Sequence, residues 1–221
     1  MKQNQDYKNE ALAALKGNWA PAVLAVIVFY VIFSAVIGPY YGYSISNALA
    51  GSYAPIPVSI LLGTSLLGFL VGWPLMIGYF NAYRSLLAVG DNRITRNMFQ
   101  MGFNNWLHNV WGGILMYVFI FLWSLLLIIP GFIKAYSYSM TFYILNERPE
   151  LSANQAIDES RRLMKGHKFD LFYLDLSFIG WYLLAGIFTL GIGILWVLPY
   201  HYTARAAFWE DIKANDPASR A

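Results

Sequence analysis

Three long stretches of the chain are built from apolar, aromatic and small polar residues, and they contain no Asp, Glu, Lys or Arg. They cover residues 17–83, 97–133 and 176–204, and they are 67, 37 and 29 residues long. A helix of about 20 apolar residues is long enough to cross a bilayer. The pattern therefore predicts an all-α, polytopic membrane protein and excludes most soluble folds.

Proline and glycine positions divide these stretches into six predicted transmembrane helices within a single membrane domain, residues 1–221. We expect the helices at residues 19–38, 58–80, 106–129, 131–145, 170–187 and 190–209. The first of them is longer than the apolar core of a signal peptide, about 7–15 residues, so we expect it to be retained. Residues 106–146 are too long for one span, and a turn is needed at Pro130-Gly131 or nearer Ser124.

Basic residues are concentrated in alternate loops of this arrangement. With six spans, 14 of the 15 Lys and Arg residues fall on the side of both termini, and Lys134 falls on the other side. Because basic loops stay in the cytoplasm, we expect both termini to be cytoplasmic. The same bias accounts for the net charge of +3, and we expect no nucleic-acid partner because no basic patch lies on a soluble domain.

A common pattern occurs in residues 1–90, 91–150 and 151–213. Each unit begins with a short amphipathic segment, breaks near a glycine, and continues into a span and a return span that contains or starts at a proline. The glycines are Gly17, Gly102 and Gly166, and the prolines are Pro74, Pro130 and Pro199. Since all three units run in the same direction, they would be parallel repeats. Chance similarity between helical hairpins is the alternative.

The second half of the chain carries recognisable motifs. They read IPGFIKAYSYSM at residues 129–140, SRRLMKG at 160–166 and LSFIGW at 176–181, with LKGNW at 15–19 near the start. On these residues the chain resembles the bacterial membrane proteins of domain-of-unknown-function family 975, most specifically over residues 129–212. The resemblance implies a multi-pass protein of the bacterial cytoplasmic (inner) membrane. It implies no established activity and no catalytic residues.

Residue types that carry most catalytic and metal chemistry are missing or scattered. The chain has no Cys, which excludes disulfides, Cys-ligated metals and thiol nucleophiles. His108, His167 and His201 are far apart in the sequence. No phosphate-binding loop, zinc-protease helix or serine-hydrolase elbow is present in the sequence. We therefore expect no enzyme, no cofactor and no metal site.

Ionisable side chains inside predicted spans are the strongest candidates for a functional site, because they are costly in lipid and face protein or water. Asp175 lies roughly 8 Å into the fifth span. We expect it to have a basic or hydrogen-bond-donating neighbour on a return helix, with Arg205 first and Arg84 as the alternative. The complete candidate set is Asp175, Arg205, His201, Lys134, Tyr136, Arg84 and Asn81.

Simpler interpretations exist for the same residues. Arg84, Arg205 and Lys134 are near enough to a membrane surface to extend their charged groups into it, and an Asp175 pair could serve only to fix helix register. Tyr136, Ser139 and Tyr143 share one helix face by their spacing. They would either line a cavity or make hydrogen bonds between helices.

Two classes of function fit these patterns, and the lipid bilayer is a partner in both. The first is transport or lipid handling through a polar cavity between the return helices, with a small polar solute or a lipid headgroup as ligand. The second is a non-transporting membrane scaffold or accessory subunit. A cavity lined by Tyr136, Asp175 and Arg205 would favour the first class, and a fully packed interior would favour the second.

Overall fold

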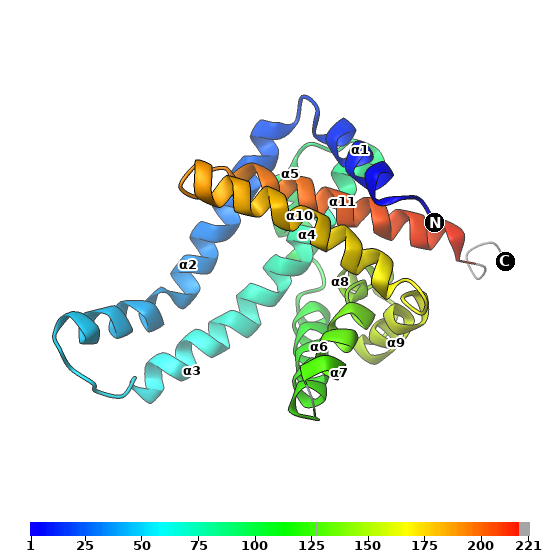
Figure 1. Ribbon diagram of the computed structural model, residues 1–221. Helices are drawn as coiled ribbons and strands as arrows, with labels where there is room; N and C mark the ends of the chain where they lie inside the picture. Colours follow the sequence, from blue (N-terminus) through cyan, green and yellow to red (C-terminus); the bar gives the residue numbers. More distant parts are fainter. Residues whose placement is uncertain (127, 217–221) are drawn as a thin grey trace.

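The computed structural model describes residues 1–126 and 128–216, and within these ranges the chain forms helices joined by turns, with no strand. The helices form three hairpins that extend away from the N-terminus and the end of α11 (Figure 1). In Figure 1 the α2–α3 and α6–α7 hairpins point downward and the α10–α11 hairpin points to the left, whereas the N-terminus and the end of α11 lie to the right. The all-α prediction is confirmed.

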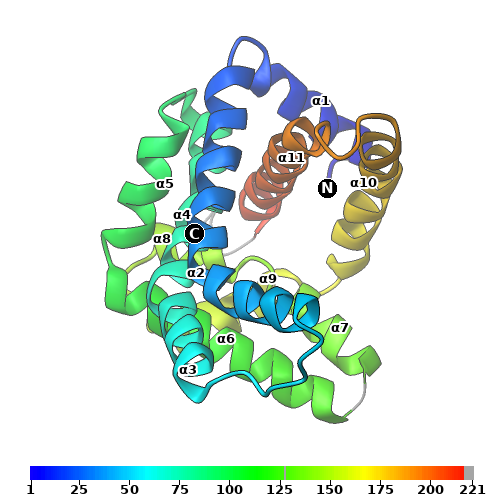
Figure 2. The ribbon, with the colours of Figure 1, turned by 90° about the vertical axis from the view of Figure 1, so that its left-hand side faces the viewer.

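The first hairpin follows a short amphipathic helix, α1, whose buried side is formed by Tyr7, Ala11 and Leu15. The next helix is longer than predicted because Pro39 lies inside it. Proline removes one backbone hydrogen bond and bends a helix without necessarily ending it, and Figure 2 shows the bent end of this helix facing the viewer. The elements are α1 (Asn4–Leu15), α2 (Trp19–Leu49), α3 (Val58–Leu67), the π-helical turn η1 (Gly68–Gly72) and α4 (Trp73–Val89).

The second unit contains α5 (Ile94–Phe103), α6 (Trp106–Leu126), α7 (Ile128–Ser137) and α8 (Thr141–Glu147). Both predicted turn positions fall within helices, Ser124 in α6 and Pro130 in α7, and residue 127 between them lies outside the described residues. The two helices approach closely, since a Cβ atom on Gly131 would lie 2.3 Å from the Ser124 hydroxyl oxygen.

The fourth predicted span, residues 131–145, is not one helix, because α7 ends at Ser137 and α8 begins at Thr141. Ser160 of α9 holds the break. Its hydroxyl donates to the Ser137 carbonyl at 3.0 Å and accepts from the Met140 N–H at 3.2 Å. A tertiary contact thus satisfies backbone groups that a continuous helix would have satisfied internally.

The third unit contains α9 (Ala153–Leu163), α10 (Lys168–Phe188) and α11 (Ile194–Asn215). Its first linker matches that of the first unit. Gly17 and Gly166 have φ values of +82° and +90°, and each is followed by a residue of nearly equal conformation, Asn18 and His167. Gly102 is instead helical, and a Cβ atom there would lie 2.3 Å from the Pro74 carbonyl oxygen. The second unit therefore uses its glycine for close packing of α5 on α4.

Four helices in the described part of the chain are long and apolar enough to cross a membrane: Trp19–Leu49, Val58–Val89, Trp106–Leu125 and Lys168–Phe188. The second of these joins α3, η1 and α4. The fourth predicted span is interrupted, and α11 carries four charged residues in its C-terminal half. The six-span count and the threefold repeat therefore stay predictions.

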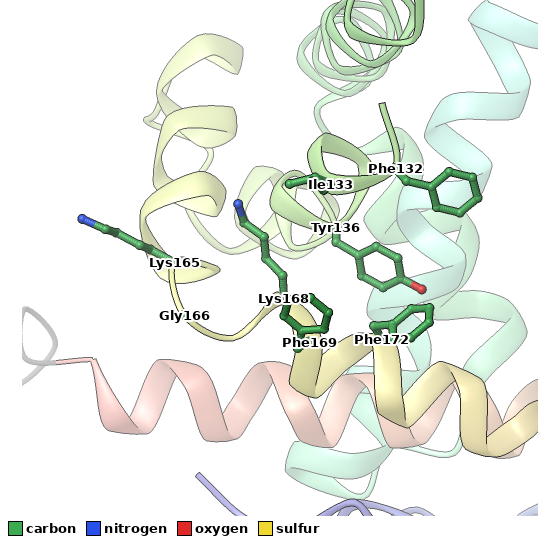
Figure 3. Close-up of a pocket in the computed structure, with 8 residues that line it drawn as sticks. All are labelled: Phe132, Ile133, Tyr136, Lys165, Gly166, Lys168, Phe169 and Phe172. Atoms are coloured by element: carbon green, nitrogen blue, oxygen red, sulfur yellow. The ribbon is translucent and has the colours of Figure 1, made fainter. Parts of the chain in front are cut away.

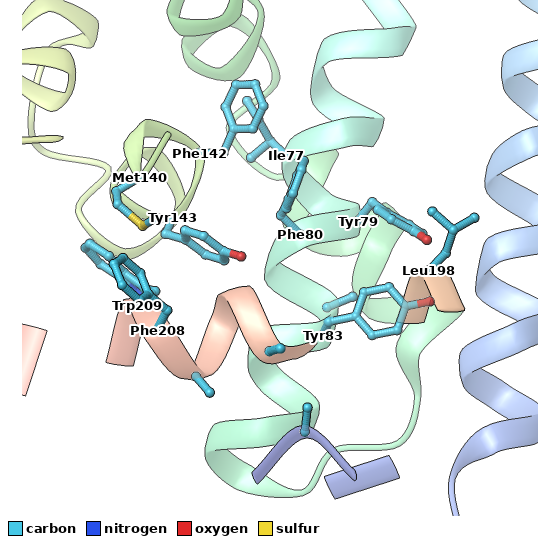
Figure 4. Packing of buried hydrophobic residues seen from close by; sticks show 14 of the residues in the cluster. Ile77, Tyr79, Phe80, Tyr83, Met140, Phe142, Tyr143, Leu198, Phe208 and Trp209 are labelled. Carbon is cyan, nitrogen blue, oxygen red and sulfur yellow. The ribbon is translucent and has the colours of Figure 1, made fainter. Parts of the chain in front are cut away.

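Aromatic side chains of the return helices α4, α8 and α11 fill the centre of the molecule (Figure 4). The Phe80 ring meets the Tyr202 ring edge-on at 4.9 Å between centroids. The Tyr143 ring stacks on Trp209 at 5.6 Å with the two planes 9° apart. These contacts pack the region between the return helices with rings.

Candidate functional site

Asp175 on α10 lies in a polar cluster with residues from α7 and α11. Its Oδ1 is 2.8 Å from Nε2 of His201, and its Oδ2 accepts a hydrogen bond from the Tyr136 hydroxyl at 3.2 Å. Nη1 of Arg205 lies 3.8 Å from the same oxygen. The carboxylate is only 18% exposed, so these groups offset the cost of holding a charge away from water.

His201 is fixed at both ring nitrogens. Its Nδ1 lies 3.0 Å from the Tyr182 hydroxyl, and its Nε2 lies 2.8 Å from Oδ1 of Asp175. In the tautomer that carries the proton on Nε2, this nitrogen donates a hydrogen bond to the carboxylate. The imidazole also stacks on Phe178, with 4.4 Å between the ring centroids. The ring cannot reorient without losing two hydrogen bonds and a stacking contact.

The prediction that Asp175 has a basic or hydrogen-bond-donating neighbour on a return helix is confirmed, but the order of partners is different. His201 is closer than Arg205, which was the first choice. Both lie on one face of α11, four residues apart. The Nε of Arg205 is buried with no hydrogen-bond partner among the described residues.

Arg84 and Asn81 belong to a different cluster, so neither is a partner of Asp175. Arg84 on α4 makes a close ion pair with Glu147 at the end of α8. Lys213 lies 2.8 Å from Glu147 and 2.8 Å from Glu210. The Asn81 amide donates to backbone carbonyls of its own helix and of α8. These residues connect the ends of α4, α8 and α11.

Lys134 is also separate from the Asp175 cluster. Its ammonium group lies over the Trp123 ring, 4.2 Å from the centroid. It lines a cavity of about 370 Å³ between α6, α7 and α9, together with Tyr138, Asn154 and Arg161. The six-span count places Lys134 and Arg161 on opposite sides of the membrane. In the fold they share one cavity because α9 packs against α6 and beside the short helix α7.

A groove of about 440 Å³ runs between α7 and α10 (Figure 3). Phe132, Phe169 and Phe172 line it together with Tyr136, whose ring meets Phe172 edge-on at 5.9 Å. Lys165 and Lys168 lie near its end at the α9–α10 linker. In Figure 3 the Lys168 side chain extends toward Ile133, whereas the Lys165 side chain extends away from the groove. Tyr136 is the link between this groove and the polar cluster, since its hydroxyl reaches Asp175.

A polar cavity between the return helices is one of two predicted alternatives, and the described residues instead form this lateral groove between α7 and α10. Tyr136 is among the residues that line the groove, but Asp175 and Arg205 are not. Aromatic rings occupy the space between the return helices. The predicted common face of Tyr136, Ser139 and Tyr143 is also wrong. The break after Ser137 leaves Tyr136 on α7 beside α10 and Tyr143 on α8 against Trp209.

Sequence reasoning missed three residues that organise these clusters. Ser160 holds the α7–α8 break, and its position among apolar residues on the buried side of α9 was the available signal. Tyr182, which contacts His201, lies seven residues after Asp175 and therefore on the same helix face. Glu147 lies at the end of α8, and the position of α8 depends on the break after Ser137. The sequence therefore gave no signal that Glu147 would pair with Arg84.

The comparisons with known proteins add a family. No curated protein and no solved structure shows significant similarity to this chain. The family described as "Protein of unknown function (DUF975)" matches residues 98–216, which is more than half of the chain and includes Asp175, His201, Arg205 and both cavities beside α7. The chain therefore belongs to the DUF975 family.

Proposed function

We propose that this protein is a membrane protein that binds an anionic lipid in the groove between α7 and α10. The observation that carries the proposal is the composition of the groove. Phenylalanine rings form its wall, two lysines lie at one end, and Tyr136 connects it to Asp175. An acyl chain matches the wall, and a phosphate headgroup matches the lysines. The protein would bind this lipid without converting it chemically.

The charges of the groove would decide which lipid binds. An acyl chain gains little by moving from the bilayer to an apolar protein surface, because both environments are apolar. A basic side chain near an anionic headgroup contributes about 1 kcal/mol, roughly fivefold in affinity. Lys165 and Lys168 would thus favour an anionic lipid over a zwitterionic one.

Transport of a polar solute between the return helices has less support, because aromatic rings fill that region. The scaffold hypothesis remains the alternative function. The packed centre and the short loops support it, and the lipid experiment below separates it from lipid binding.

We further propose that three hairpins of a threefold repeat enter the bacterial cytoplasmic membrane from the cytoplasmic side and leave both termini there. The matching linkers at Gly17 and Gly166 and the common side of the N-terminus and the end of α11 in Figure 1 support this arrangement. Since Lys134 shares a cavity with Arg161, all 15 basic residues would lie on that side.

Cysteine labelling tests the topology. Glu150 in the α8–α9 loop is exposed and therefore accessible to a label. With no native Cys to interfere, Ser46→Cys in intact cells should react with an impermeant reagent and Glu150→Cys should not. Labelling of Glu150→Cys from outside would contradict the arrangement.

Native mass spectrometry of the purified protein in detergent tests lipid binding. Phosphatidylglycerol should bind at least about fivefold more tightly than phosphatidylcholine. The double variant Lys165→Gln/Lys168→Gln should lose most of this preference. The control Lys16→Gln/Arg96→Gln removes two exposed charges on α1–α2 and α5 and should keep it. Equal binding of both lipids to the wild type would reject the proposal and favour a scaffold.

A further inference from the structure

Two cavities flank α7, and each contains basic side chains. Ile133 and Tyr136 line the groove toward α10, whereas Lys134 and Tyr138 line the cavity toward α6 and α9. We infer that the lipid carries two phosphates, with one beside Lys165 and Lys168 in the groove and the other beside Lys134 in the cavity. This inference rests on the proposed lipid binding and specifies the chemical class of lipid.

The charge of Lys134 is the first observation behind the inference. Among the residues that the structure describes, no carboxylate lies within ion-pair distance of its ammonium group. Trp123 faces that group through its ring, which leaves N–H donors for an oxygen ligand. Arg161, in the same cavity, is balanced by Asp158 at 3.1 Å, so Lys134 gives the cavity a net positive charge.

The proximity of the two basic sites is the second observation. Lys134 shares the cavity with Arg161, and its neighbour Ile133 lines the groove together with Lys168. Asp158 also lines the cavity and balances Arg161, so the charges of Lys134 and Lys168 are the ones that a bound anion would stabilise. An anion that reaches both cavities would satisfy Lys134 and Lys168.

The cavity also has the size and the donors for a phosphate group. Its volume of about 370 Å³ lies within the range of small-ligand sites. Tyr138 and Asn154 provide a hydroxyl and an amide beside the two basic side chains. Basic pockets between membrane helices bind lipids such as cardiolipin, in which two phosphates are joined through one glycerol. Such a lipid would place one phosphate on each side of Lys134 and keep its acyl chains against the groove wall.

Competition between cardiolipin and phosphatidylglycerol tests the inference. In native mass spectrometry the wild type should bind one cardiolipin at least about fivefold more tightly than phosphatidylglycerol. Lys134→Met keeps an apolar side chain on Trp123 and removes the charge. This variant should lose the preference for cardiolipin and still bind phosphatidylglycerol as the wild type does. Arg96→Gln, an exposed charge on α5, is the matched control and should change neither lipid.

The outcomes separate this inference from the proposed function. Equal affinity of the wild type for the two anionic lipids, or an equal loss of both in Lys134→Met, would overturn the two-phosphate inference and leave anionic lipid binding intact. If only Lys165→Gln/Lys168→Gln weakened binding of cardiolipin and phosphatidylglycerol, and Lys134→Met changed neither, the two-phosphate inference would also be overturned. Failure of the wild type to prefer either anionic lipid over phosphatidylcholine would reject lipid binding itself. Displacement of cardiolipin by millimolar inorganic phosphate would assign the cavity to a free anion and contradict the inference.

Discussion

Two arginines on return helices, Arg84 and Arg205, meet carboxylates in different ways. Arg84 makes a direct ion pair with Glu147, and Lys213 and Glu210 complete a network of two positive and two negative charges at helix ends. Arg205 is 3.8 Å from Asp175, whose nearest donor is His201. The carboxylate at the helix ends is thus neutralised mainly by cations. The one inside a candidate membrane helix is satisfied mainly by hydrogen-bond donors, with a cation farther away.

This difference predicts that the Arg84 network is the more sensitive to loss of its carboxylate. Glu147→Gln leaves Arg84 and Lys213 with Glu210 as the remaining carboxylate of the network. Breaking a largely buried pair costs several kcal/mol, and since both side chains keep some exposure we expect about 2–3 kcal/mol. The melting temperature in detergent should fall by about 5–10 °C.

The control for this change is Glu150→Gln, which removes an exposed carboxylate from the α8–α9 loop. Its melting temperature should stay within about 1–2 °C of the wild type, because surface substitutions rarely exceed 0.5 kcal/mol. Equal shifts for the two variants would show that Glu147 is not the centre of the network.

The Asp175 cluster should show smaller losses and a preference among its partners. Asp175→Asn and His201→Phe each remove one side of the 2.8 Å contact, while phenylalanine keeps a ring over Phe178. A double-mutant cycle should give a coupling of about 1–2 kcal/mol between these residues. The coupling of Asp175 with Arg205→Gln should be below about 1 kcal/mol, because the two groups are farther apart. If the Asp175 and His201 losses simply add, the contact is not a functional pair.

The same contrast explains which parts of the site could be predicted from the sequence. Asp175 was found because it is a lone carboxylate close to a long charge-free stretch, and its partners His201 and Arg205 lie four residues apart on one helix. These are local patterns, and the helical periodicity preserves them in the fold. The charge-free stretches predicted the all-α class for the same reason, since burial of apolar side chains does not depend on the exact path of the chain.

The remaining features depend on tertiary contacts that leave no local pattern. Glu147 reaches Arg84 because α7 and α8 are separate helices, and Ser160 from a third helix holds that break. Lys134 was placed at the far turn by charge counting, but the packing of α9 brings Arg161 to it. The first predicted span ends at residue 38, before Pro39, whereas in the fold the helix continues through Pro39 to Leu49.

A third carboxylate, Asp211, lies on α11 beyond the predicted sixth span. We expect it to contribute less to stability than Glu147 or Asp175. It holds α1 by accepting hydrogen bonds from the Tyr7 hydroxyl at 2.8 Å and from the Lys2 N–H at 2.9 Å. Burial acts to raise the pKa of Asp211, but these donors outweigh it and hold the pKa below its ordinary value. The stabilisation is therefore present above the unfolded pKa of about 3.9 and is lost as the pH falls through the lower folded pKa.

Asp211→Asn should accordingly cost about 1 kcal/mol at pH 7, and hydrogen exchange should show faster opening of α1 with little change in α10. The difference between variant and wild type should shrink as the pH falls below about 4 and vanish below the lower folded pKa, where the wild-type carboxylate is also neutral. Tyr7→Phe removes one donor, so its loss of α1 protection should begin at a higher pH than in the wild type. A pH-independent difference between Asp211→Asn and the wild type would mean that Asp211 holds α1 by packing alone. Asp211 would then differ in kind from both Glu147 and Asp175, whose charges we expect to decide their contributions.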